Sequence, residues 1–197
     1  MTKSNFITNP ALELRTNDFL NKFIICENVF NSHECDKIIN LRGNKDASLI
    51  FGYKDMIVSP SYRNSHTNWI SFHERMEWCI NRISDAFQIV NNKYFNFNLE
   101  YIGDFNVLRY PVNGHYKNHI DLGTNDVSRR KLSMVCFLSS PKDYEGGKLV
   151  FELLGSDFPQ KKGSIIFFPS YLFHKVDYVT RGERYTIVAW AYGPTYR

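Results

Sequence analysis

The sequence has little of several features that would place it in a special class of proteins. No apolar run approaches the roughly eighteen residues that a membrane-spanning helix requires. The first residues, Met1 to Phe6, lack the apolar segment of a secretory signal, so we expect a chain that is neither exported nor membrane-bound. With 24 basic and 20 acidic residues, the net charge is only +4, which argues against a nucleic-acid partner.

Cysteine is also scarce and unpatterned. The four cysteines form no CxxC pair and no spacing typical of a disulfide framework or a zinc site. Three of them fall within predicted helices or an apolar strand, where the expected state is a buried, reduced thiol. Reduced thiols indicate a reducing compartment, so we expect the protein to be cytoplasmic. The cysteines are Cys26, Cys35, Cys79 and Cys136.

The N-terminal half has helical patterns. Residues Asn31 to Glu34 resemble a capping box, with Ser32 as the expected cap, ahead of a helix that Gly43 would end. A second helix is expected from about Phe72 to Lys93, because its apolar residues recur at three- and four-residue spacings that form one buried face.

From residue 99 onward the pattern changes to short β-rich segments separated by turn residues, which is typical of an antiparallel sandwich or barrel. We therefore predict a single domain over residues 1–197, of the α+β class but mainly β. It would comprise a polar arm (1–21), a helical support region (22–98) and a jelly-roll, or double-stranded β-helix, core (99–192). Strands are expected at residues 23–26, 100–110, 117–122, 132–138, 147–153, 164–168, 173–178 and 184–192.

Three residues in the β-rich part could bind a metal: His119, Asp121 and His174. Residues i and i+2 of a strand point to the same face, so His119 and Asp121 are expected to project side by side. His174, from a distant strand, would complete two imidazoles and one carboxylate with open positions, the ligand set of non-haem Fe(II) sites. A catalytic zinc takes the same ligands, and a lone His-x-Asp is equally typical of a polar strand face.

Two further residues make the metal interpretation stronger. Arg184 follows His174 by ten residues and lies in an apolar strand, where a buried cation requires a buried anion. Tyr110 precedes His119 by nine residues, and Tyr116 also flanks the triad. A guanidinium and a phenol together suit the far carboxylate of a dicarboxylate whose other end chelates the metal. The alternative for Arg184 is a surface pair with Glu183 or Glu152.

With segments such as 94–98, 144–149 and 163–169, this pattern resembles the 2-oxoglutarate/Fe(II) dioxygenase superfamily, in its prolyl-4-hydroxylase-like branch, over residues 23–190. The resemblance implies that the triad binds Fe(II) and is catalytic, and that Arg184 and Tyr110, with Tyr116 as a further candidate, bind 2-oxoglutarate. One position departs from the family pattern: Gly114 stands four residues after Tyr110 instead of three.

The resemblance also implies a reaction. Dioxygen would convert 2-oxoglutarate to succinate and CO2 while an unactivated C–H bond is hydroxylated, with ascorbate as a supporting reductant. The implied substrate is a prolyl or other side chain of a peptide or protein, bound between residues 51–65 and 122–131. A free amino acid, a small metabolite and a nucleobase stay open as substrates. A non-enzymatic, cupin-like metal or small-molecule binder is the alternative from another class. The sequence does not specify the oligomeric state.

Two neighbouring features have simpler interpretations. His115 falls in the predicted turn before the triad, so we expect it to face solvent or substrate and not to bind the metal. The basic run from Arg129 to Lys131 precedes a predicted strand. We interpret this run first as a solvated turn and second as part of a substrate rim.

Overall fold

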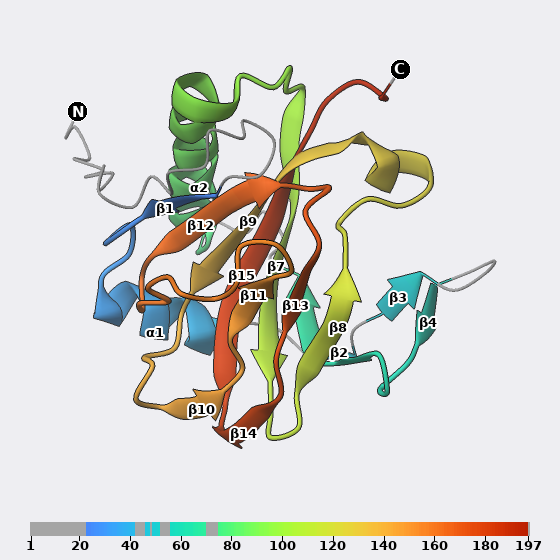
Figure 1. The fold of residues 1–197 in the computed structure, drawn as a ribbon. Coiled ribbons are helices and arrows are strands. Elements are labelled where there is room, and N and C mark those ends of the chain that lie inside the picture. The colour runs from blue at the N-terminus through green and yellow to red at the C-terminus, as the bar shows by residue number, and fades with distance from the viewer. Residues whose placement is uncertain (1–22, 42–45, 48, 52–55, 70–74, 197) are drawn as a thin grey trace.

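The computed structural model describes residues 23–41, 46–47, 49–51, 56–69 and 75–196 of the chain. The predicted polar arm (1–21) and the first residues of the predicted second helix (72–74) lie outside the described residues. Within them, two β-sheets face each other, and two α-helices cover the outer side of the larger sheet (Figure 1). This is the predicted architecture, so the mainly β, α+β fold class and the jelly roll are confirmed.

The larger sheet is antiparallel throughout and has the strand order β1-β12-β9-β15-β7-β6-β2. Strand β15, which follows the predicted bounds, lies at its centre between β9 and β7. The strands are β1 (Ile24–Cys26), β12 (Ile165–Pro169), β9 (Arg130–Phe137), β15 (Arg184–Tyr192), β7 (Tyr101–Tyr110), β6 (His66–Trp69) and β2 (Asp46–Ala47).

The smaller sheet has the order β11-β13-β8-β5 and is also antiparallel. Its strands are β11 (Leu149–Phe151), β13 (His174–Val176), β8 (His115–His119) and β5 (Arg63–Asn64). Two separate two-stranded antiparallel sheets complete the described strands, β10 (Tyr144–Gly146) with β14 (Val179–Gly182), and β3 (Leu49–Phe51) with β4 (Met56–Val58).

The central strand separates two hydrophobic cores. Ile187 and Ala189 of β15 pack with the helices in one core, whereas Val188 packs into the second core, between the two sheets. Because side chains alternate along a strand, the inner face of β15 carries Arg184, Thr186, Val188 and Trp190. The interior of the jelly roll is therefore lined by a strand with several polar residues.

The helices begin and end for identifiable local reasons. Helix α1 (Ser32–Leu41) starts with a capping box, but its cap is Asn31 and not the predicted Ser32. The Asn31 side chain accepts the Glu34 N–H at 2.9 Å, and the Glu34 carboxylate accepts the Asn31 N–H at 2.9 Å. Helix α2 (Glu77–Val90) ends earlier than predicted. It continues as a π-helical turn, η2 (Asn91–Phe95), which closes at Asn96 with φ 55°.

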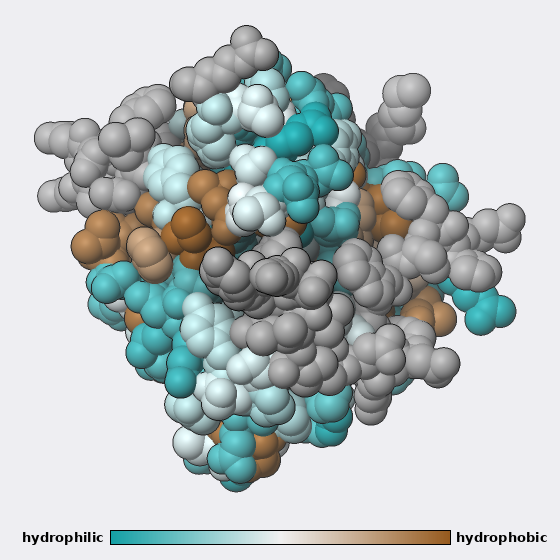
Figure 2. Space-filling model, turned by 90° about the vertical axis from the view of Figure 1, so that its right-hand side faces the viewer, coloured by the Kyte–Doolittle hydropathy of each residue, from teal (hydrophilic) through white to brown (hydrophobic). Residues whose placement is uncertain are grey.

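Several predicted strands are shorter in the structure. Strand β8 ends at His119 instead of residue 122, and β13 covers only residues 174–176 of the predicted 173–178. A short 3-10 helix, η3 (Asn125–Arg129), leads into β9. Among the described residues, no helix has the length and apolar character needed to cross a membrane. On the face shown in Figure 2, residues of hydrophilic or intermediate hydropathy surround separate groups of hydrophobic residues, which are coloured brown.

Candidate metal centre

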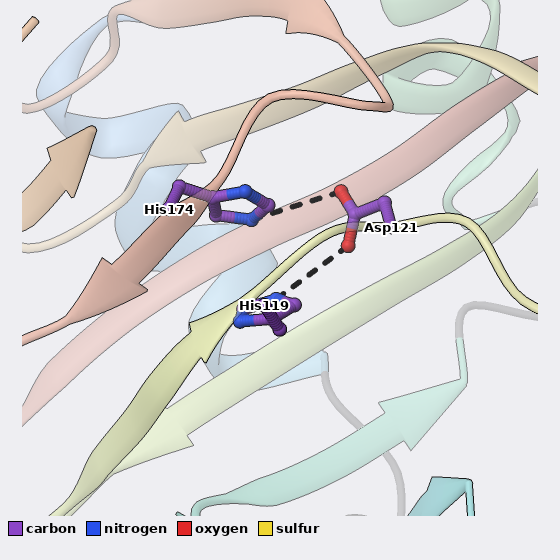
Figure 3. A group of neighbouring side chains, drawn as sticks. All are labelled: His119, Asp121 and His174. Carbon is purple, nitrogen blue, oxygen red and sulfur yellow. Dashed lines mark ion pairs between the residues drawn. The ribbon is translucent and has the colours of Figure 1, made fainter. Parts of the chain in front are cut away.

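The three predicted metal ligands lie together in the structure (Figure 3). His119 is the last residue of β8 and His174 is the first of β13, and the strand register pairs them directly. Asp121 Oδ1 lies 3.6 Å from His119 Nε2, and Asp121 Oδ2 lies 3.8 Å from His174 Nε2. The ligand atoms of all three fall within 4.8 Å of one another, a spacing at which one metal ion could contact all three.

Asp121 reaches this position by a different route from the predicted one. It lies two residues beyond the end of β8, so strand alternation does not place it. Its backbone N–H donates to the carbonyl of Ser170 at 2.9 Å, which ties the segment after β8 to the loop before His174. The two ligand-bearing segments are therefore held together by a backbone hydrogen bond.

Hydrogen bonds fix how the two histidines present their nitrogens. His119 Nδ1 lies 2.8 Å from the Lys117 carbonyl, and His174 Nδ1 lies 2.9 Å from the Leu172 carbonyl. A carbonyl oxygen only accepts, so each Nδ1 carries a proton and donates it, and each Nε2 faces Asp121. Metal-bound histidines characteristically donate their other ring N–H in this way.

The electrostatics of the group also suit a cation. Burial lowers the pKa of His174 to about 4, with a further contribution from the neighbouring His119, so this imidazole is neutral at pH 7. Burial alone would raise the pKa of Asp121, but His174 and His119 outweigh it and hold that pKa well below its usual range. A carboxylate beside two imidazole Nε2 atoms is the donor set that a divalent non-haem iron takes.

Arg184 is the first residue of β15 and lies on the inner face of that strand. Its side chain is among the largest fully buried ones, with 1% exposure, and its register partner on β7 is Tyr110. The guanidinium carbon is 5.2 Å from the centre of the Tyr110 ring. Among the described residues, Nε and Nη2 of Arg184 have no hydrogen-bond partner. The alternative of a surface ion pair is thus wrong.

Sequence reasoning missed Thr186. This residue is 1% exposed, and its hydroxyl has no hydrogen-bond partner among the described residues. It lies two positions after Arg184, on the same face of β15. Threonine is a common strand residue, so only its i+2 relation to Arg184 could have drawn attention to it. Gly147 lies beside this strand face, and a Cβ added to it would come within 3.1 Å of Arg184 Cδ, so a larger residue there would crowd the arginine side chain.

The two candidate tyrosines occupy different places. Tyr110 is buried beside Arg184, as described above, whereas the Tyr116 ring stacks on His119, with centroids 3.5 Å apart and planes 19° apart. The guanidinium of Arg63 covers Tyr116 at 4.6 Å. Burial raises the pKa of Tyr116, which keeps its hydroxyl protonated and able to donate. Tyr116 is thus placed against a metal ligand and Tyr110 against the buried cation.

The expected place of His115 in a solvent-facing turn is wrong, whereas the expectation that it does not bind the metal stays a prediction. The residue is the first of β8 and only 5% exposed, so it does not lie in a turn facing solvent. Its ring stacks on Tyr178 with centroids 4.1 Å apart. Nδ1 lies 3.0 Å from the Asn113 carbonyl, and Nε2 lies 3.4 Å from the Ser61 carbonyl. These contacts come from residues that the local sequence pattern does not reveal.

Comparison with known proteins agrees with this site. Residues 105–192 match the family model described as the 2OG-Fe(II) oxygenase superfamily. A PKHD-type hydroxylase of Crocosphaera subtropica is 38% identical over 89 residues, which are 43% of this chain and 40% of the relative. One from Thermosynechococcus vestitus is 40% identical over 95 residues, or 45% of this chain and 42% of the relative. The chain thus matches about two fifths of these relatives' length.

Solved structures share the fold across most of the chain. A prolyl hydroxylase from Trichoplax adhaerens, in complex with a hypoxia-inducible-factor peptide fragment, aligns with a TM-score of 0.71 and 20% identity over 87% of this chain and 84% of its own. A viral collagen prolyl hydroxylase of Paramecium bursaria Chlorella virus-1, solved as a 2OG complex, aligns with a TM-score of 0.68 and 22% identity. This alignment covers 88% of this chain and 97% of the viral protein. The predicted resemblance to 2-oxoglutarate/Fe(II) dioxygenases with a prolyl-4-hydroxylase-like fold is confirmed.

Proposed function

We propose that this chain is a 2-oxoglutarate- and Fe(II)-dependent dioxygenase that hydroxylates an unactivated C–H bond. The observation that carries the proposal is the pairing of two incomplete groups inside one jelly roll. One is a cluster of two histidines and an aspartate with its Nε2 and carboxylate atoms facing one another. The other is a buried guanidinium that lacks an anion.

In this proposal, His119, Asp121 and His174 hold the metal. The two Nε2 atoms and the Asp121 carboxylate are the atoms that would bind it. Bound Fe(II) and 2-oxoglutarate would supply the activation of dioxygen, with succinate and CO2 as co-products. The protein contributes orientation, because the Nδ1 hydrogen bonds and the Asp121–Ser170 bond fix the three ligands before any metal arrives.

Arg184 is the proposed anchor for the far carboxylate of 2-oxoglutarate. Its free Nε and Nη2 can donate two parallel hydrogen bonds to a carboxylate. Two hydroxyl groups could donate further hydrogen bonds to the same carboxylate. One is the phenol of Tyr110 on the neighbouring strand β7, and the other is the hydroxyl of Thr186 on β15. Because Arg184 is buried, water cannot solvate the guanidinium as well as it would at the surface, and a bound carboxylate would neutralise its charge.

Tyr116 has a distinct proposed role. Stacked on His119, it fixes the orientation of that imidazole and walls the metal site on the side of β5. Its protonated hydroxyl is available as a donor to 2-oxoglutarate or to the substrate. We propose it as a further cofactor contact, second to Tyr110 and Arg184.

For the substrate, we propose a prolyl or other side chain of a peptide or protein. The PKHD-type hydroxylase relatives, and the presence of a peptide in one prolyl hydroxylase of the same fold, support a peptide. A free amino acid or small metabolite is the alternative substrate, and a cupin-like binder without activity is the alternative function. Support by ascorbate, a cytoplasmic location and the organisation of residues 1–197 as one domain stay predictions.

The test is an anaerobic addition of Fe(II) and 2-oxoglutarate, followed by oxygen and an assay for succinate. We expect a weak visible charge-transfer band before oxygen enters and succinate afterwards. His174→Ala should lose both, whereas His33→Ala, the same change at an exposed histidine of α1, should keep both. Metal-loaded wild-type protein that does not bind 2-oxoglutarate would contradict the proposal and favour a cupin-like binder.

A further inference from the structure

His115, the first residue of β8, is a buried histidine that the proposed chemistry does not use. It lies four residues before the metal ligand His119, where β8 begins beside β14 (Figure 1). Only 5% of the residue is exposed, and both of its ring nitrogens face backbone carbonyls. The imidazole is thus held from two sides.

The two carbonyls belong to different parts of the chain. Nδ1 of His115 lies 3.0 Å from the carbonyl oxygen of Asn113, in the turn before β8. Nε2 lies 3.4 Å from the carbonyl oxygen of Ser61. Asn113 is itself fixed, because its N–H donates to the Val179 carbonyl of β14 at 2.8 Å. His115 therefore bridges the jelly roll and residues 59–64, which we call the strap.

The bridge depends on the protonation state of the imidazole. A carbonyl oxygen only accepts hydrogen bonds, so both ring nitrogens donate only when the ring carries two protons and a positive charge. In the neutral ring with its proton on Nδ1, the Nε2 lone pair faces the Ser61 oxygen, and two acceptors repel each other. The distance of 3.4 Å is long for a hydrogen bond and can shorten when Nε2 gains a proton. Only the protonated form of His115 thus completes the bridge.

The aromatic neighbour of His115 also suits a positive ring. The imidazole stacks on the ring of Tyr178, with centroids 4.1 Å apart and planes 26° apart. The face of an aromatic ring attracts a cation at this distance. The stacking therefore favours the same protonated form that the two carbonyls favour.

The charged side chains on the neighbouring elements are directed elsewhere. The Arg63 guanidinium covers a ring of β8, Asp177 pairs with Lys175 at 2.8 Å, and Arg181 pairs with Glu145 at 2.8 Å. The titratable and charged groups on the elements around the ring are Tyr62, Arg63, Tyr116, Lys117, Asp177, Tyr178 and Arg181. The contacts that change with the charge of the imidazole are consequently the two carbonyls and the Tyr178 ring.

The strap connects His115 to the metal centre. The Tyr62 ring meets the Tyr116 ring edge-on, with centroids 5.9 Å apart, and the Tyr62 carbonyl accepts the Lys117 N–H at 2.9 Å. The Arg63 guanidinium covers the Tyr116 ring at 4.6 Å. Since Tyr116 stacks on His119, a change in the strap reaches a metal ligand through one ring.

We propose that His115 is a positioning residue for the metal centre: its protonated ring fastens the strap to β8, and the fastened strap holds Tyr116 against His119. The positioning role rests on the proposed function, whereas the fastening of the strap does not. Histidine changes its charge between about pH 5 and 8, so the strap is held tightly in the lower part of this range and more loosely in the upper part. Metal ligands have the opposite dependence, because protonation at low pH weakens metal binding.

Hydrogen exchange of the metal-free protein, followed by mass spectrometry of peptides that cover residues 59–67, tests the fastening. After correction for the intrinsic exchange rates, opening of the strap should increase roughly tenfold between about pH 6 and about pH 8, because a hydrogen bond to a charged group is lost. His115→Gln cannot become positively charged and should show equal opening at both pH values. His33→Gln, at an exposed histidine of α1, is the matched control and should behave like wild type.

The positioning role is tested by the Fe(II) concentration that gives half of the charge-transfer band, with 2-oxoglutarate present and oxygen absent. At about pH 6, where histidine is largely protonated, His115→Gln should need roughly threefold more Fe(II) than wild type. At about pH 8 the variant and wild type should need the same concentration, since the strap is loose in both. The titration of the metal ligands themselves affects both proteins equally and cancels in this comparison.

The outcomes separate this inference from the proposed function. Equal opening of the wild-type strap at both pH values, or a pH difference that persists in His115→Gln, would overturn the inference. This wild-type comparison decides the question alone if His115→Gln does not fold. A lost pH difference in exchange with an unchanged Fe(II) requirement at the lower pH would overturn the positioning role. Absence of the band in wild-type protein would contradict the proposed function, whatever the exchange measurement shows.

Discussion

Two arginines at the two ends of the same jelly roll have opposite surroundings. Arg184, at the start of β15, is 1% exposed and has two guanidinium nitrogens without a partner among the described residues. Arg130, opposite the end of β15, bonds to Asp104 and Tyr192 and lies against Trp190. A buried cation normally carries its own counter-charge, and this contrast is the reason why we propose Arg184, and not Arg130, as a ligand-binding residue.

The largest effect should come from removing the incomplete arginine. Arg184→Ala should lower kcat/KM for 2-oxoglutarate by roughly a hundredfold or more, because a charge-assisted bidentate contact is lost. The loss should appear mainly as a higher KM for 2-oxoglutarate. Steady-state succinate formation over a range of 2-oxoglutarate concentrations measures it.

A matched control is Arg181→Ala, since Arg181 is exposed and pairs with Glu145. It should behave like wild type. Equal losses in the two variants would mean that Arg184 is not the carboxylate anchor.

Substitutions of the two arginines should also change the free energy of unfolding in opposite directions when it is measured without cofactors. Arg184→Met removes a buried charge with no counter-ion and should raise the free energy of unfolding by roughly 1–3 kcal/mol. Arg130→Met removes the ion pair with Asp104 and the donor to the Tyr192 hydroxyl, and should lower it by roughly 1–3 kcal/mol. Urea unfolding of the metal-free proteins gives both values. Destabilisation by both changes would remove the contrast on which the ligand site rests.

A bound carboxylate should supply the missing hydrogen-bond acceptor of Arg184, whereas the contacts of Arg130 should not change. Added to metal-loaded protein at about a hundred times its dissociation constant, 2-oxoglutarate should stabilise the fold by roughly 2.7 kcal/mol. The shift should persist in Arg130→Met and disappear in Arg184→Met. Thermal unfolding with and without 2-oxoglutarate measures it, and a shift that survives in Arg184→Met would place the ligand elsewhere.

The smallest effect should be that of Thr186. Thr186→Val keeps the shape but removes one neutral hydroxyl donor, so the KM for 2-oxoglutarate should rise by roughly fivefold with little change in kcat. Thr180→Val, at an exposed threonine of β14, is the control. An unchanged KM for 2-oxoglutarate would mean that Thr186 does not bind the far carboxylate and that only Arg184 and Tyr110 do.

Much of this architecture could be predicted from local patterns. The spacing of apolar residues indicated the helices and strands, and an arginine inside an apolar strand indicated a buried cation. The meeting of His119 with His174 is a register between strands far apart in the chain, and the local pattern alone left it as one interpretation among several.

The features that could not be predicted depend on long-range contacts. Asp121 is positioned by Ser170, and His115 is buried by Ser61 and Tyr178, none of which a strand or turn pattern reveals. The pairing of the basic run from Arg129 to Lys131 is another case, because Asp104 and Glu100 reach that run only once β7 and β9 lie on either side of β15. Thr186 was overlooked because threonine in a strand is unremarkable until its hydroxyl is seen to be buried.

The central claim is that the same jelly roll contains a three-residue metal centre and an arginine that binds the far carboxylate of 2-oxoglutarate. An anaerobic titration of 2-oxoglutarate into Fe(II)-loaded protein, followed by its visible charge-transfer band, tests this most directly. The account predicts a saturable band in wild-type protein, the same band at much higher concentration in Arg184→Ala, and none in His174→Ala. A band that saturates at the same concentration in wild type and Arg184→Ala would contradict it.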